Sequence, residues 1–109
     1  MHELSITQSV VDAVCRRAGD RTVHSVQVHI GALTAVVPEA MRFCFDLVTE
    51  GTVAAGARLD IDQRPGAGHC RSCDTDIVLA DAVLLCPCGS ADVEVTAGRE
   101  LQIVSMEVG

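Results

Sequence analysis

The 109-residue sequence has no lysine, tryptophan or tyrosine, and its only phenylalanines are Phe43 and Phe45. All eight cationic side chains are arginines, and the formal net charge is −7. Proteins hold phosphate backbones with clustered Lys and Arg, and they stack single-stranded bases on aromatic rings. The sequence therefore disfavours nucleic acid as a partner.

Long apolar runs are also missing. The longest uninterrupted run covers only residues 82–86, whereas a helix that crosses a bilayer needs about 20 apolar residues. No basic stretch followed by an apolar stretch, as in a signal peptide, stands near the start of the sequence. We expect a cytoplasmic protein that does not bind membranes.

Four of the six cysteines are spaced as Cys70-x-x-Cys73 and Cys86-x-Cys88, with residues 74–85 between the pairs. Four thiolates on two tight turns can surround one tetrahedral ion, and Zn(II) is the usual occupant of such a site. A lobe of about twenty residues has almost no core, so metal binding must supply most of its folding free energy. We expect these four cysteines to hold a structural zinc ion.

Two alternatives stay open at this cluster. Zinc ribbons commonly have two residues between the second pair of cysteines, and here Pro87 stands alone, so His69 is an alternative ligand. The other alternative is a redox pair of thioredoxin type at Cys70 and Cys73. That pair follows a glycine-rich stretch and has no helix signal behind it, which disfavours the redox interpretation.

The remaining pattern indicates secondary structure for the rest of the chain. Helical periodicity predicts helices over residues 4–18 and over residues 38–50, the second opened by proline and glutamate. Alternation of apolar and polar residues predicts strands over residues 26–30, 59–64 and 101–108. In the last strand the alternation of inward-facing apolar residues shifts by one position at residues 104–105. This shift in phase predicts either a β-bulge or a strand whose two faces are both covered by other parts of the protein.

This order of elements indicates an α+β fold, with a small three-stranded mixed sheet, two helices on one face and an inserted zinc-ribbon lobe. We expect residues 66–68, with the sequence Gly-Ala-Gly, to act as a hinge. The predicted domains are a lobe of residues 1–65 and 92–109, which carries the N-terminus, and a zinc-binding lobe of residues 66–91. A hinged insert can exchange between protomers, so a monomer and a weak homodimer are both open.

The chain begins with Met1, His2 and Glu3. A bulky second residue normally prevents removal of the initiator methionine, so we expect the Met1 amine to be free. Amine and imidazole nitrogens are partly unprotonated near neutral pH, and closely spaced nitrogens favour square-planar Ni(II) or Cu(II). Glu3 can add an amide nitrogen, a carboxylate oxygen or a hydrogen bond that orients His2. On the residues alone, a metal site and an ordinary solvated helix start both stay open.

Several motifs resemble the HypA/HybF family of hydrogenase maturation factors. They are Met-His-Glu-Leu at residues 1–4, Ile-Gly-Ala-Leu at 30–33, the stretch 37–45, Gly-Thr at 51–52, both cysteine pairs with Gly-Ser at 89–90, and Gly-Arg-Glu-Leu at 98–101. The resemblance covers essentially the whole chain. The family pattern has two residues between the last two cysteines, where this chain has one.

The resemblance implies a nickel metallochaperone that delivers Ni(II) to a [NiFe]-hydrogenase large-subunit precursor, and in some organisms to urease, together with the GTPase HypB. It also implies that His2, assisted by Met1 and Glu3, binds the transported nickel, while the four clustered cysteines hold structural zinc. We expect no enzymatic activity, because the sequence has no set of nucleophile, acid and base. The alternative is a zinc-ribbon adaptor that binds a protein partner and transfers no metal.

Overall fold

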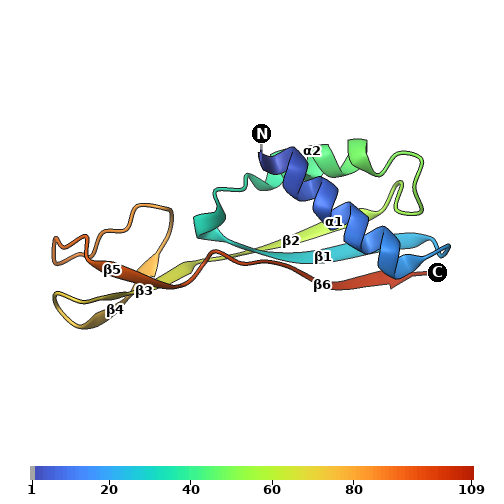
Figure 1. The fold of residues 1–109 in the computed structure, drawn as a ribbon. Helices are drawn as coiled ribbons and strands as arrows, with labels where there is room; N and C mark the ends of the chain where they lie inside the picture. Colours follow the sequence, from blue (N-terminus) through green and yellow to red (C-terminus); the bar gives the residue numbers. More distant parts are fainter. Residues whose placement is uncertain (1) are drawn as a thin grey trace. The chain divides into compact units, whose positions relative to one another are not determined.

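The computed structural model describes residues 2–109, except for the side chain of His2. The elements are α1 (His2–Ala18), β1 (Val23–Gly31), the short 3₁₀ helix η1 (Ala32–Thr34), α2 (Pro38–Val48), β2 (Arg58–Arg64), β3 (Gly66–Cys70), β4 (Thr75–Leu79), β5 (Val93–Ala97) and β6 (Leu101–Val108) (Figure 1). The strands form two three-stranded sheets, ordered β2-β1-β6 and β4-β3-β5. Neither α1 nor α2 has the length and hydropathy of a membrane-spanning helix.

The chain divides into two compact units. The first holds the chain up to Val28, Val36–Asp62 and Gln102–Gly109, and the second holds His29–Ala35 and Gln63–Leu101. The second unit thus includes β5 and the segment after β1, which the predicted domain division placed with the N-terminal lobe. The predicted division into two separately folding lobes stays a prediction.

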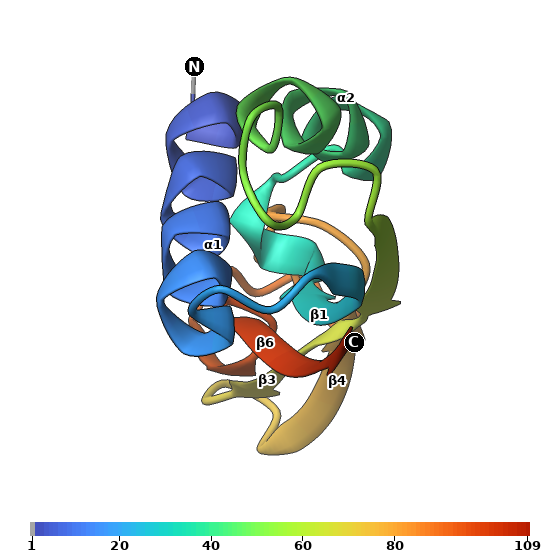
Figure 2. The same ribbon diagram turned by 90° about the vertical axis from the view of Figure 1, so that its right-hand side faces the viewer.

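In the first unit α1 and α2 lie side by side on one face of the sheet (Figures 1 and 2). α2 begins at Pro38, as its sequence predicts, whereas α1 begins at His2, two residues before the predicted start. One acidic residue stands in the first turn of each helix, where it suits the positive end of the helix dipole. α1 ends at Ala18 and is followed by Gly19, whose φ of +65° favours glycine and whose N–H donates to the carbonyl of Cys15. The core is formed by the inward faces of both helices and by β1, with Val14, Met41, Phe45 and Val26 all buried.

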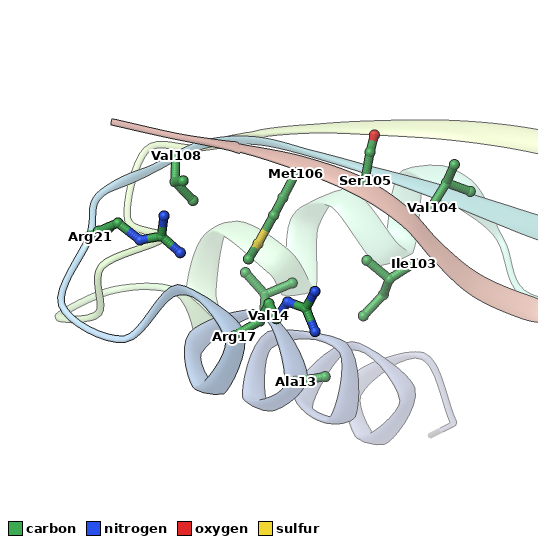
Figure 3. Close-up of a pocket in the computed structure, with 9 residues that line it drawn as sticks. All are labelled: Ala13, Val14, Arg17, Arg21, Ile103, Val104, Ser105, Met106 and Val108. Carbon is green, nitrogen blue, oxygen red and sulfur yellow. The ribbon is translucent and has the colours of Figure 1, made fainter.

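The sheet of β1, β2 and β6 is mixed, as predicted. β1 and β2 run in the same direction and β6 runs against them (Figure 1). The predicted phase slip in β6 is also present. Ile103, Met106 and Val108 all point toward α1, whereas Val104 and Ser105 point away from it (Figure 3). The two helices, the sheets and the cysteine cluster confirm the predicted α+β fold with a zinc-ribbon lobe.

The predicted hinge at residues 66–68 is wrong. These residues lie in β3, the central strand of the second sheet, which pairs antiparallel with β4 and β5. A Cβ atom on Gly68 would lie 2.7 Å from Cγ1 of Val93, and one on Gly66 would lie 2.9 Å from Cγ of Leu33. The glycines therefore allow close packing in the strand, and they do not mark a flexible linker.

Candidate metal centre

The four clustered cysteines come from two segments of the second unit. Cys70 ends β3, Cys73 lies in the turn before β4, and Cys86 and Cys88 lie in the loop between β4 and β5. Their Sγ atoms all lie within 4.8 Å of one another. Two pairs join the two segments: the Sγ atoms of Cys70 and Cys88 are 3.7 Å apart, and so are those of Cys73 and Cys86.

This spacing fits a tetrahedral site with four sulfur ligands. When each sulfur lies about 2.3 Å from a central ion, tetrahedral geometry puts neighbouring sulfurs about 3.8 Å apart. The two measured separations are close to that value and far above the S–S bond length of about 2.05 Å in a disulfide. Within residues 2–109, apart from the side chain of His2, no other group of three or more Cys, His, Asp or Glu is close enough to hold an ion. The four thiols can therefore hold one metal ion.

Local hydrogen bonds explain how the shortened second pair still brings both thiols inward. The N–H of Cys86 donates to the carbonyl of Ser90 at 2.9 Å, and the N–H of Gly89 donates to the carbonyl of Cys86 at 2.8 Å. Gly89 has a φ of +96°, a conformation that favours glycine. The N–H of Cys88 donates to Sγ of Cys86 at 3.5 Å. A tight turn with one intervening residue thus presents both sulfurs to the same point.

Two serines that the sequence analysis did not assign to the site connect its two segments. The hydroxyl oxygens of Ser72 and Ser90 lie 2.7 Å apart and share a hydrogen bond. Ser72 directly precedes Cys73 in the sequence, and Ser90 is two residues after Cys88. Their closeness to the cysteines in the sequence could have indicated a role at this site. It does not show that the two hydroxyl groups contact each other.

Two of the four thiols, those of Cys70 and Cys86, have shifted pKa values. The backbone N–H of Cys73, aided by that of Ser72, lowers the pKa of Cys70 to about 6. At Cys86 the backbone N–H of Cys88 also lowers the pKa, but burial and the neighbouring thiols outweigh it and raise the pKa to about 12. Adjacent thiolates repel one another, so a positive ion among them would favour deprotonation of the whole group.

His69 lies outside the group of four thiols. Neighbouring residues of a strand point to opposite faces, so His69 points away from Cys70. Its Nδ1 lies 2.8 Å from a carboxylate oxygen of Asp76, and its Nε2 lies 2.9 Å from one of Asp74. The hydrogen bond with Asp76, followed by the weaker effect of the one with Asp74, raises the pKa of His69. The structure therefore groups the four cysteine thiols, and the imidazole of His69, the alternative ligand, is not among them.

The predicted nickel ligands are only partly within the described structure. Met1 and the side chain of His2 lie outside the described residues. Glu3 is half-buried in the first turn of α1, where a carboxylate suits the positive end of the helix dipole. Its carbonyl accepts a hydrogen bond from the hydroxyl of the buried Thr7 at 2.5 Å. Nickel binding by these residues stays a prediction.

Comparison with known proteins connects the whole chain to one family. Residues 1–108 match the family described as "Hydrogenase/urease nickel incorporation, metallochaperone, hypA". The chain is 47% identical over 112 residues to hydrogenase maturation factor HypA from Methylocella silvestris, covering 99% of both chains. It is 45% identical over 109 residues to the HypA of Trichodesmium erythraeum, covering 99% of this chain and 96% of that one.

Solved structures show the same fold. The solution structure of the Ni metallochaperone HypA from Helicobacter pylori has a TM-score of 0.64 with 21% identity, covering 97% of this chain and 96% of that chain. At this identity the likeness shows the fold alone. The family description names a metallochaperone and no catalysed reaction. The family match and the sequence relatives show that this chain belongs to the HypA family of hydrogenase maturation factors.

Proposed function

We propose that this protein is a nickel metallochaperone that binds Ni(II) at its N-terminus and delivers it for maturation of [NiFe]-hydrogenase, with urease as a further client. The family match over residues 1–108, which includes Met1, His2 and Glu3, carries this proposal. The nickel ion is cargo, and the protein catalyses no reaction. A carrier must release its ion, so a terminal site that solvent can reach suits this task better than a buried cage.

The chemistry of the first three residues fits nickel. The amine of Met1, the amide nitrogen of His2 and the imidazole of His2 are closely spaced nitrogen donors, which favour square-planar Ni(II) over tetrahedral zinc. Glu3 either completes the site or orients His2. Protons compete with nickel for the amine and the imidazole, which gives a simple route to release.

Zinc at the four cysteines has a structural role in this proposal. Four protein ligands fill a tetrahedral site and leave no open position for a substrate. The 3.7 Å separations between sulfurs of the two segments support this assignment. The ion stabilises the second unit because it fixes the turns around Cys70, Cys73, Cys86 and Cys88.

The proposed partners follow from the same family membership. They are a HypB-type nickel GTPase and the hydrogenase large-subunit precursor, and the proposed location is the cytoplasm. A chain with net charge −7 and no lysine is a poor ligand for nucleic acid. The proposed oligomeric state is a monomer or a weak homodimer.

Calorimetric titration of untagged protein with Ni(II) tests the proposal. His2→Ala should weaken nickel binding by about tenfold or more, because even residues that merely orient a ligand contribute that much. His24→Ala is the matched control, since His24 is an exposed histidine on β1. Both variants should keep their zinc. Equal nickel binding by wild type and His2→Ala would contradict the N-terminal site, and zinc-loaded protein that binds no nickel would favour the adaptor alternative.

A further inference from the structure

The first unit contains a pocket that nickel and zinc binding do not use. It lies between α1 and β6 and has a volume of about 510 Å³ (Figure 3). Val14 of α1 and Ile103, Met106 and Val108 of β6 contribute apolar side chains to its wall. The phase slip in β6 puts Ile103 and Met106 on the same side, and this widens the apolar surface. The pocket therefore has room for a large apolar side chain.

β6 is an edge strand, because the sheet order is β2-β1-β6. Its outer edge pairs with no strand within residues 2–109, and Ile103 and Val104 are 38% and 48% exposed. Proteins usually protect such edges with lysine, proline or inward-pointing charges. β6 contains neither lysine nor proline, and Glu107 is its only charged residue. The edge is thus open to a further strand, apart from the local irregularity at residues 104–105.

Two cations stand at the same pocket. Arg17 belongs to the last turn of α1, Arg21 follows the helix, and both line the pocket. Within residues 2–109, the side chain of His2 apart, neither forms a salt bridge with a carboxylate, and Nε of Arg21 donates only a long hydrogen bond to the carbonyl of Ala18 at 3.4 Å. The chain has fifteen acidic residues against eight arginines. Unpaired guanidinium groups on so acidic a protein are well placed to bind an incoming carboxylate.

We propose that the pocket between α1 and β6 binds an extended acidic segment of a partner protein, whose backbone adds to the free edge of β6. An apolar side chain of the segment enters the pocket over Val14 and Met106, and a neighbouring carboxylate pairs with Arg17 or Arg21. In this mode main-chain hydrogen bonds supply affinity, and the pocket selects the side chains. The proposal does not depend on nickel binding.

A random-peptide phage library, selected on the full zinc-loaded protein, tests this proposal. Selected peptides should alternate apolar residues with Asp or Glu, and they should shift the backbone NMR signals of residues 101–108 and of the end of α1. Their affinity should fall about tenfold or more in Arg17→Glu and in Arg21→Glu, because each change replaces attraction by repulsion. Arg16→Glu makes the same charge change beside the pocket without lining it, so it should have little effect.

Several results would overturn the proposal. These are failure to select any peptide, selected peptides without acidic residues, signal shifts confined to other strands, and an equal loss of affinity in Arg16→Glu. Binding of citrate to the pocket, without any peptide selection, would indicate a small-anion site and would also overturn it. An unchanged NMR fingerprint in the variants excludes unfolding as the cause of a loss. Nickel titration is measured separately, so failure here leaves the metallochaperone proposal intact.

Discussion

Leu33 donates its backbone N–H to the carbonyl of Gly98 at 2.8 Å, and its side chain lies so close to this glycine that an added Cβ atom would come within 2.9 Å of Cγ. The side chain of Leu33 also packs against the buried cluster of Cys70, Leu79, Cys86 and Val93. Leu33, which follows β1, therefore belongs to the small core beside the cysteine cluster. Changes at Leu33 or Gly98 should act on the second unit first.

Gly98→Ala should destabilise the second unit strongly. Gly98 has a φ of +116°, and a Cβ atom there would lie 2.6 Å from Cα of Gly66. Backbone strain and overpacking together should cost about 2 kcal/mol or more in free energy of unfolding, measured by urea denaturation. Gly56→Ala is the control, since its φ is also positive but no atom lies within 4 Å. Equal costs for the two variants would contradict the close packing of Gly98.

Leu33→Ala should remove part of the core beside the metal centre. The loss should be about 1–3 kcal/mol, below the cost for a fully buried leucine, because Leu33 is half-buried. The variant should also lose zinc at a lower chelator concentration than wild type. Leu85→Ala changes an exposed leucine of the same unit and should have little effect on stability. If Leu33→Ala were as stable as Leu85→Ala, this result would contradict the packing of Leu33 against the buried cluster.

Glu100 should make the second unit sensitive to pH. Its Oε2 accepts the N–H of Gly98 at 2.8 Å, and this bond, followed by the N–H groups of Glu100 and Arg99, lowers its pKa. A lowered pKa stabilises the folded state above the ordinary carboxyl value of about 4.3, and this stability is lost as pH falls through the folded-state pKa. Glu100→Gln should therefore lower the melting temperature at pH 7 and have little effect well below pH 4. An equal decrease at both pH values would contradict the role of the charge.

Cys73→Ser should release the metal ion from the second unit. Cys73 is exposed, so the substitution removes a ligand and almost no packing. Metal analysis should find much less than the one zinc ion per chain expected for wild type, and hydrogen exchange should show opening of β3, β4 and β5. Cys15→Ser, which changes a cysteine of α1 outside the cluster, should keep its zinc. Full zinc content in Cys73→Ser would exclude ligation by this thiol.

The first unit was largely predictable because its signals are local. Pro38 and Glu39 mark the start of α2, and the alternation from Val26 to Ile30 marks β1. Each of these patterns acts within a few residues of the chain. The phase slip in β6 could be predicted too, because the order of side chains along one strand determines which face each of them occupies.

The strand β3 was not predictable from composition, because Gly66 and Gly68 also occur in flexible linkers. Their role depends on Leu33 and Val93, which are far away in the sequence. The cysteine spacing predicted the metal centre, but whether both thiols of the second pair could reach it depends on the φ of Gly89 and on bonds to Ser90. The pocket at Arg17 and Arg21 had no local signal, because exposed arginines are ordinary on helix surfaces.

The central claim is that nickel and zinc occupy separate sites of different chemistry. X-ray absorption spectra of untagged protein loaded with both metals test it directly, because each edge reports the ligands of one element. The nickel edge should show nitrogen and oxygen ligands in a planar arrangement, and the zinc edge should show four sulfurs at about 2.3 Å. Sulfur ligands at the nickel edge of the native protein would contradict the account.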